Sequence, residues 1–323
     1  MSSAGDSGPV YLIDASIYIF QSHFSPYVEC YSRRGEELSA VYGFTQFLLQ
    51  FLRRASPTHA AVAHDESLFC GFRHQLCPNY KSNRELPDEN LAMQLGACIE
   101  ICEILGLSAF ASKVYEADDI IGTLATSVRK ETIADGRDLL PINIVSRDKD
   151  LAQLLHHEHD CLWEFSQNQR RFAADIVEDM GVRPDQIVDY LALAGDSVDC
   201  IGGVPGIGAV KAKALLAHFE SLQEIMESLE QVKQLPLRGA NSLASKLEEH
   251  REAAELSYQL ATIVCDVTDK KETFVELSMH DLQVEAVDLD ELRSFLVEYQ
   301  FHSEESERIV NQAQRLSAAG IAS

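Results

Sequence analysis

The chain has 323 residues, a formal net charge of −24 and a hydrophobic content of 46%. This length suits two domains, and this composition suits a globular protein with a sizeable core. The negative charge argues against broad, unspecific attraction to nucleic acid, although a basic groove can coexist with an acidic remainder. No apolar stretch approaches the ~20 residues of a membrane span. Residues 1–9 lack the basic and apolar regions of a signal peptide, so we expect a short disordered lead.

The sequence contains eight cysteines and no Cys-x-x-Cys pair. Cys98 and Cys102 lie four residues apart on an apolar helical stretch, where packing is the expected role. Because the spacing shows neither a disulfide framework nor a zinc site, we expect reduced thiols in a cytoplasmic protein with no membrane partner.

Residues 10–175 alternate short apolar runs with helical patterns, which is typical of a parallel sheet covered by helices. The expected elements in chain order are a strand at 10–13, a helix at 40–52, a strand at 60–63, helices at 90–105 and 118–130, and a strand at 142–145. Beyond residue 175 strand-like runs nearly vanish, and the expected helices cover 184–193, 209–219, 237–263 and 290–299. The sequence therefore predicts an α/β domain over 10–175, a helical domain over 176–270, and a segment over 271–323 that packs back on the core, with its last residues disordered.

Acidic residues follow the three apolar runs, and two further acidic clusters lie elsewhere. Asp14 ends the first run, Asp65 follows the second, and Asp148 and Asp150 follow the third. The further clusters are Glu116, Asp118 and Asp119, and Asp196 with Asp199. In a parallel sheet the carboxyl ends of strands share one crevice, and so many carboxylates require counter-charge.

This pattern predicts a site for divalent cations. Mg²⁺ and Mn²⁺ take oxygen ligands, and two such ions ~3.5–4 Å apart can clamp a phosphodiester. Each cluster by itself has another reading, because acids stabilise helix N-termini and aspartate is common in turns. The repetition of acids at equivalent topological positions favours the metal site.

A glycine-rich turn separates two of the expected helices. Its sequence is Gly202-Gly203-Val204-Pro205-Gly206-Ile207-Gly208, and Lys211 and Lys213 follow in the next helix. Glycines allow positive φ and close approach of the backbone, and the helix N-terminus offers free N–H groups to a phosphate. The turn thus predicts a helix-hairpin-helix that grips a DNA backbone through Gly206, Gly208, Lys211 and Lys213. A plain corner between two helices is the alternative.

The connection between Asp65 and Asn90 carries Arg73, Tyr80, Lys81 and Arg84. A base can stack on the tyrosine ring, and the cations can hold phosphate. Alone, these residues fit an ordinary solvated loop equally well. Beside a metal cleft they predict contacts with nucleic acid.

In these residues the chain resembles the structure-specific 5′-nuclease (flap endonuclease) family, and most of all the 5′–3′ exonuclease domain of bacterial DNA polymerase I in a stand-alone form. The resemblance covers about residues 10–301. The motifs that carry it are Ile-Asp-Ala-Ser at 13–16, Tyr-Lys-Ser-Asn-Arg at 80–84, Glu-Ala-Asp-Asp-Ile-Ile-Gly-Thr-Leu-Ala at 116–125, Arg-Asp-Lys-Asp-Leu-Ala-Gln-Leu at 147–154, Leu-Ala-Gly-Asp-Ser-Val-Asp at 193–199, Val-Pro-Gly-Ile-Gly at 204–208 and Leu-Ser-Tyr-Gln-Leu-Ala-Thr-Ile at 256–263.

The resemblance implies a PIN-like (resolvase-like) α/β fold followed by a helix-hairpin-helix domain. It also implies two groups of metal ligands, Asp14, Asp65, Glu116 and Asp118 with Asp119 nearby, and Asp148, Asp150, Asp196 and Asp199. Lys81, Arg84 and Asp118 would be catalytic residues. Lys81 and Arg84 would stabilise the scissile phosphate, with Tyr80 beside them. A potassium ion would bind backbone carbonyls of the hairpin, which fall on Leu193, Ala194, Gly202, Val204 and Ile207.

The resemblance further implies a two-metal 5′–3′ exonuclease or 5′-flap endonuclease in replication and repair. The expected partner is DNA with 5′ flaps, nicks or ends, RNA of primers is a further candidate, and a monomer is expected. Departures from the family pattern occur at Ala15, Gln21, Cys200, Gly202 and residues 209–211. Two alternatives stay open: a catalytically weak DNA-binding member of the family, and a metal phosphatase acting on small phosphoesters.

Overall fold

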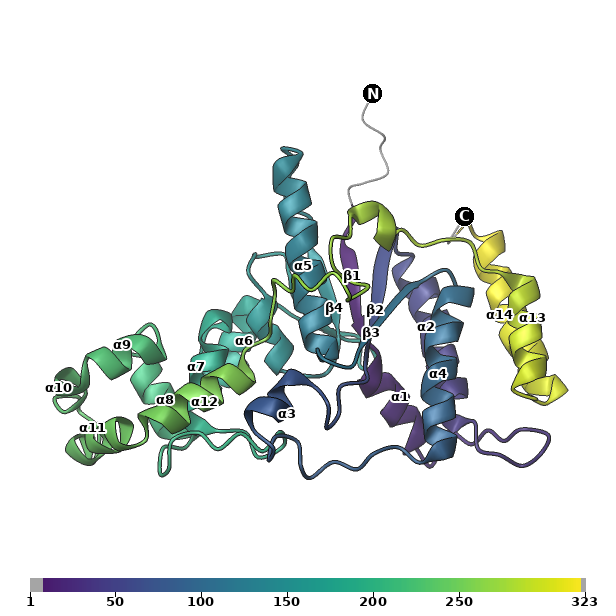
Figure 1. Cartoon of the computed structure of the whole chain (residues 1–323). Helices are drawn as coiled ribbons and strands as arrows, with labels where there is room; N and C mark the ends of the chain where they lie inside the picture. The colour runs from purple at the N-terminus through teal and green to yellow at the C-terminus, as the bar shows by residue number, and fades with distance from the viewer. Residues whose placement is uncertain (1–7, 321–323) are drawn as a thin grey trace.

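A six-stranded sheet forms the centre of the molecule in the computed structural model, which describes residues 8–320 (Figure 1). Most of the lead expected at 1–9 and the last residues of the chain lie outside that range. The strand order is β3-β2-β1-β4-β5-β6, and only β6 runs antiparallel to its neighbour. The strands are β1 (Val10–Asp14), β2 (His59–Asp65), β3 (Ser108–Ser112), β4 (Ile142–Val145), β5 (Cys161–Glu164) and β6 (Gln169–Arg171). The predicted, mostly parallel sheet is confirmed.

The alternation of side chains along β1 explains why both faces of the sheet are covered. Val10 and Leu12 belong to one hydrophobic cluster, and Tyr11 and Ile13 belong to the other. Successive side chains of a strand point to opposite faces, so a strand that is apolar at every position must be buried on both sides.

Helices from distant parts of the chain cover the two faces. The cluster that contains Tyr11 and Ile13 includes side chains of α1 (Ala15–His23), α2 (Ser39–Ala55), α4 (Glu89–Ile104), α13 (Leu289–Glu298) and α14 (Ser303–Ala318). The other cluster includes side chains of α5 (Ala117–Ala134) and of the helical domain. Short helices complete this part of the fold: α3 (Phe72–Leu76) and the 3-10 turns η1 (Asp150–Leu154), η2 (Pro184–Gln186) and η3 (Met279–Leu282).

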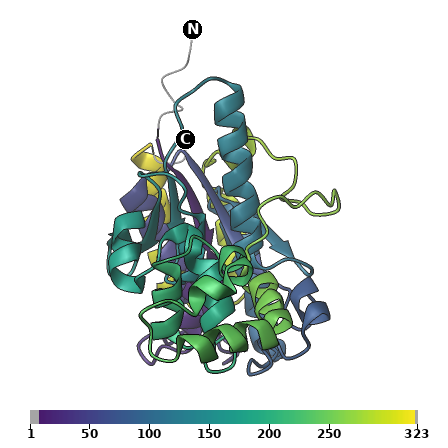
Figure 2. The ribbon, with the colours of Figure 1, turned by 90° about the vertical axis from the view of Figure 1, so that its left-hand side faces the viewer.

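The helical domain extends away from the sheet and lies in front of it when viewed from its own side (Figure 2). Its helices are α7 (Ile187–Ala194), α8 (Ala209–Leu216), α9 (Leu222–Glu227), α10 (Leu229–Val232), α11 (Ala240–Glu249) and α12 (Arg251–Ala261), and α6 (Ala173–Met180) precedes it. The single helical run expected over 237–263 was wrong, because the chain turns at His250. The turn lets α11 pack on α10 while α12 packs on α7.

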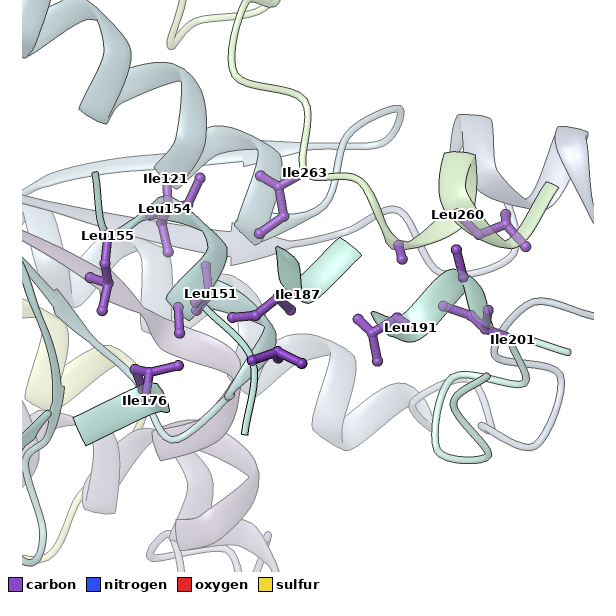
Figure 3. Close-up of a cluster of buried hydrophobic side chains, with 14 of the residues drawn as sticks. Ile121, Leu151, Leu154, Leu155, Ile176, Ile187, Leu191, Ile201, Leu260 and Ile263 are labelled. Carbon is purple, nitrogen blue, oxygen red and sulfur yellow. The ribbon is translucent and has the colours of Figure 1, made fainter. Parts of the chain in front are cut away.

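One hydrophobic cluster joins the two domains (Figure 3). Ile121 on α5 and Leu151 on η1 belong to the sheet domain, whereas Ile187, Leu191 and Leu260 belong to the helical domain, and all five side chains are buried. Protein interiors are close-packed and transmit strain, so this shared core holds the helical domain in one position relative to the sheet edge. No helix within residues 8–320 has both the length and the apolar character needed to cross a bilayer.

Candidate metal centre and nucleic-acid interface

The parallel register brings the acids that follow β1, β2 and β4 to the same edge of the sheet. Asp14 is paired in register with Ala63, close to the end of β2, and Ile13 is paired with Val145, the last residue of β4. Asp14 also begins α1, where its carboxylate accepts hydrogen bonds from Ser16 N at 3.1 Å and from Ser146 Oγ at 2.9 Å. The strand ends therefore place this carboxylate in the middle of the crevice.

The carboxylates of the crevice repel one another. Burial, with repulsion from Asp148 and Asp65, raises the pKa of Asp14 to about 7. Burial, with repulsion from Asp148, Asp196 and Asp199, raises the pKa of Asp150 to about 8. A bound cation stabilises the ionised form of a carboxylate most where the neighbouring side chains are also acids.

The same two causes act on three further acids of the crevice. Burial and the nearby Glu116 raise the pKa of Asp65. Burial and repulsion from Asp148 and Asp14 raise the pKa of Asp118 well above its ordinary value, and burial and Asp199 raise the pKa of Asp148. These interactions link the two groups of acids into one electrostatic unit.

An open pocket of about 460 Å³ lies over the second group of acids. Its lining consists of Ile17, Arg84, Arg147, Asp148, Lys149, Asp150, Asp196, Val198 and Asp199. Within residues 8–320, no three histidine, cysteine or acidic side chains converge closely enough to enclose a metal ion on their own. Mg²⁺ usually keeps several waters and takes only one or two carboxylates, so an open set of oxygen donors, in which Asp148 and Asp150 have raised pKa values, fits this ion.

Glu116 differs from the other acids because cations surround it. Its carboxylate receives hydrogen bonds from Lys81 Nζ at 2.9 Å and from the Tyr80 hydroxyl at 3.0 Å, and Arg73 Nη1 lies 3.5 Å away. Burial by itself would raise the pKa of Glu116, but Lys81 and Arg73 outweigh it and the net shift is downward. Glu116 therefore stays ionised at the N-terminus of α5 without a metal.

Lys81 and Arg84 both reach the acids of the pocket. The Lys81 backbone has a positive φ of 48°, its N–H donates to the Asp199 carbonyl at 3.0 Å, and its Nζ lies 3.7 Å from the Asp199 carboxylate. Arg84 Nη2 donates to Asp199 Oδ1 at 2.8 Å and remains partly exposed. Asn83 Nδ2 donates to the Val198 carbonyl at 3.1 Å, so the two loops that carry these residues are tied together.

The structure corrects the roles expected for Arg73 and Asp119. Arg73 is 3% exposed and donates to both oxygens of Asp119, at 2.6 and 2.8 Å, and to the carbonyls of Leu260 and Thr262. Asp119 is fully buried and also accepts from the backbone N–H of Val264 at 2.8 Å. Because these partners use its donors, Arg73 is not available to DNA, and Asp119 has no oxygen free to bind a metal directly.

Tyr80 also differs from its expected role as a platform for a base. The side chain is 2% exposed, and its hydroxyl is bound to Glu116. A buried ring cannot stack on a nucleotide, so Tyr80 instead supports the carboxylate of Glu116 from below the surface.

The glycine-rich hairpin joins α7 to α8 through close contact of two backbone segments. Gly203 has a φ of 62°, and a Cβ there would collide with Gly195 N and lie 2.7 Å from Ala194 C. Gly202, by contrast, has open space around it. The Val204 N–H donates to the Leu193 carbonyl at 3.0 Å, and the Ile207 N–H donates to the Val204 carbonyl at 2.9 Å.

The cations expected to follow the hairpin divide into two environments. Lys211 Nζ donates to the Gly206 carbonyl at 2.9 Å, so it lies at the tip of the hairpin. Lys213 instead lies over the ring of Tyr190, 5.9 Å from its centroid. Lys246 on α11 also reaches Gly206, since its Nζ occupies the space that a Cβ would need there. Local sequence carries no signal for Lys246, because it comes from another helix.

Two family models together cover residues 9–290. Residues 9–181 match the N-terminal, resolvase-like domain of 5′-3′ exonuclease, and residues 182–290 match its C-terminal SAM fold. The chain belongs to the 5′-3′ exonuclease family. This confirms the predicted family, its nuclease chemistry and the fold class.

Individual relatives support the same assignment. The chain is 30% identical to a 5′-3′ exonuclease of Buchnera aphidicola over 269 residues, which cover 81% of this chain and 88% of that protein. It is 38% identical to DNA polymerase I of Pseudomonas aeruginosa over 260 residues, 80% of this chain but only 27% of that protein. A structure of the bacteriophage T5 flap endonuclease with DNA and metal ions shares the fold, with a TM-score of 0.61 at 17% identity over 95% of this chain and 99% of that one.

Sequence reasoning missed two cations at the carboxylate pocket of this 5′-3′ exonuclease family member. Arg147 and Lys149 line the pocket and alternate with Asp148 and Asp150 along the chain. The motif Arg-Asp-Lys-Asp at 147–150 carried a signal for them, because residues adjacent in the chain to acids that face a pocket lie near its rim.

Proposed function

We propose that this protein is a metal-dependent 5′–3′ exonuclease and 5′-flap endonuclease, which hydrolyses phosphodiesters of branched or nicked DNA in replication and repair. The observation that carries the proposal is the pocket in which Asp148 and Asp150 have raised pKa values and Asp199 lies against Lys81 and Arg84. The basic side chains suit an anionic substrate, and the acids suit the metal ions that its hydrolysis requires. Family membership and the names of the relatives support the same reaction.

Two Mg²⁺ or Mn²⁺ ions would be held by two sets of oxygen donors. One set is Asp14, Asp65, Glu116 and Asp118, and the other is Asp148, Asp150, Asp196 and Asp199. When bound, such ions act as Lewis acids and lower the pKa of water, so that hydroxide forms near neutral pH. Divalent zinc ions are bound in a solved structure of the T5 5′-exonuclease, and the T5 D15 protein was co-crystallized with metal ions, which supports this part of the proposal.

The protein's own cations would act on the phosphate. The Lys81 ammonium and the Arg84 guanidinium lie against Asp199 at the pocket, where they can offset negative charge that grows on the phosphate oxygens. Glu116, Tyr80 and the backbone bond from Lys81 to Asp199 hold the ammonium in place before the substrate arrives. A fixed donor costs no reorganisation at the moment of reaction.

The hairpin would hold the duplex beside the cleavage site. Gly206 and Gly208 carry no side chains of their own at its tip, and Lys211 and Lys246 place positive charge there. Lys213 would contribute more weakly, since it lies over Tyr190. The carbonyls of Leu193 and Ala194 at the end of α7, and of Gly202, Val204 and Ile207 in the hairpin, would bind the proposed potassium ion.

The proposal also includes the setting in which the protein works. All eight cysteines are free thiols, which supports a reducing compartment such as the cytoplasm. We further propose a monomer whose substrates are DNA with 5′ flaps, nicks or ends, with RNA of primers as a further substrate.

Cleavage of a labelled 5′-flap duplex tests the proposal. Wild-type protein should cut the flap strand with Mg²⁺ and stop with EDTA, and Asp118→Ala should remove cleavage while DNA binding persists. Asp290→Ala, which removes an exposed acid on α13, is the matched control and should cut normally. Cleavage by Asp118→Ala at the wild-type rate would refute the metal assignment. Binding without cleavage in both Mg²⁺ and Mn²⁺ would favour a DNA-binding member of the family instead.

A further inference from the structure

Arg147 occupies the rim of the carboxylate pocket in a defined orientation. It lies just beyond the end of β4, and its side chain is 45% exposed. Its Nε lies 3.1 Å from Oε1 of Glu164, the last residue of β5. Adjacent parallel strands therefore supply both members of the pair.

Glu164 requires this cation. Its side chain is 10% exposed, and its Oε1 is buried without a hydrogen-bond partner. A buried carboxylate is costly unless a counter-charge accompanies it, so the position of Glu164 constrains the position of the guanidinium. The ion pair uses Nε of Arg147, which leaves the two terminal nitrogens for another partner.

Metal binding does not explain the cations around this pocket. Arg84, Arg147 and Lys149 line it together with Asp148 and Asp150, and a cation would repel a metal ion rather than hold it. A backbone phosphate explains both the basic and the acidic residues. Its negative oxygens can pair with the basic side chains and also with metal ions that the acids hold. In a chain of net charge −24, such contacts must be local to the site.

We propose that Arg147, positioned by Glu164, binds a backbone phosphate of the nucleic-acid strand that enters the carboxylate pocket, in addition to the phosphate that Lys81 and Arg84 meet. The planar guanidinium presents donors in a fork that matches two phosphate oxygens, and a lysine cannot reproduce that fork. Glu164 is a positioning residue in this arrangement. The inference rests on the proposed nuclease function, but its first readout is binding.

The test measures equilibrium binding of a nicked duplex in EDTA at several KCl concentrations, and then kcat and KM with Mg²⁺. Arg147→Gln should weaken binding about tenfold, as expected for the loss of one charge-assisted contact. It should reduce the slope of log affinity against log salt by ~0.7–0.9. KM should rise with kcat nearly unchanged, and Arg147→Lys should recover only part of the loss.

Arg293→Gln is the matched control. Arg293 has 48% side-chain exposure and pairs with the exposed Asp290 at 2.8 Å on α13, so this variant removes the same charge from an arginine of similar exposure away from the pocket. It should leave affinity, salt slope and KM unchanged. If Arg147→Gln behaves like Arg293→Gln, the proposal is wrong, whereas cleavage by both variants would leave the nuclease function intact.

A second pair of variants separates phosphate binding from folding. Arg147→Gln leaves Glu164 buried without its cation, whereas the double variant Arg147→Gln with Glu164→Gln removes both charges. The folded double variant should still show weak binding and the reduced salt slope. Wild-type binding in this double variant would overturn the proposal. Glu164→Gln alone should raise KM less than Arg147→Gln does, because it releases the guanidinium without removing it.

Discussion

Asp118 and Asp119 are neighbours in the sequence, but loss of charge should affect the stability of the metal-free protein in opposite directions. Both oxygens of Asp119 are bound by Arg73, at 2.6 and 2.8 Å, and further accept the N–H groups of Val264 at 2.8 Å and Glu116 at 3.0 Å. Asp118 instead faces other acids, and burial together with Asp148 and Asp14 raises its pKa. One carboxylate is stabilised as an anion, and the other is destabilised.

Asp119→Asn should lower the free energy of unfolding by about 3 kcal/mol or more. Breaking a buried ion pair costs ~3–5 kcal/mol, because the remaining charge stays buried without its partner. Here the remaining charge is Arg73, which is only 3% exposed. Asp118→Asn should leave the free energy of unfolding unchanged or raise it, since a neutral amide removes the repulsion.

Urea unfolding in EDTA at neutral pH measures both effects. The two variants and the wild type should show equal m-values, so that the midpoints report stability directly. The double variant Arg73→Met with Asp119→Leu is the control, and it should regain much of the lost stability because it removes both charges. A stability of Asp119→Asn within 1 kcal/mol of wild type, or a lower stability for Asp118→Asn than for Asp119→Asn, would refute the reasoning.

Three further predictions follow from the site. The pKa values of Asp14 (about 7) and Asp150 (about 8) lie above the 3.8 of an unperturbed aspartate. Between these values the folded, metal-free protein binds more protons than the unfolded chain. Its free energy of unfolding should therefore fall as the pH rises from the unperturbed value through the raised values. Melting curves should therefore show a larger gain from Mg²⁺ at the alkaline end than at the acidic end, and an equal gain at both would contradict the assignment. Lys81→Ala should reduce kcat by ~10²–10³-fold, as for loss of a preorganised donor, while affinity for flap DNA in EDTA changes little. Single-turnover cleavage measures this effect. An unchanged cleavage rate would exclude the role proposed for the Lys81 ammonium. Gly203→Ala should lower both the melting temperature and the affinity for duplex DNA, because its Cβ would lie 2.7 Å from Ala194 C, whereas Gly202→Ala has open space and should match wild type.

The sequence by itself determined three of the six strands of the sheet, the position of the acids and the hairpin. Strands β1, β2 and β4 were predicted because each is a short apolar run, and a parallel arrangement then required the acids to meet at one edge. The small residues of β3, Ser-Ala-Phe-Ala-Ser, lack that apolar signal, and this strand was not predicted. Periodicity, turn residues and repeated acids are local signals, and they can be found in a sequence without knowledge of the fold.

Only the tertiary structure decided which charged residues face the substrate. Arg73 and Arg84 lie in the same connection, but Arg73 is buried against Asp119, 46 positions away, and Leu260, 187 positions away, whereas Arg84 reaches the pocket. Burial of a charge depends on partners that meet it in the folded protein, and no local pattern encodes partners at such separations. For the same reason Lys246 and the pair of Arg147 with Glu164 became visible only when the helices and strands were packed together.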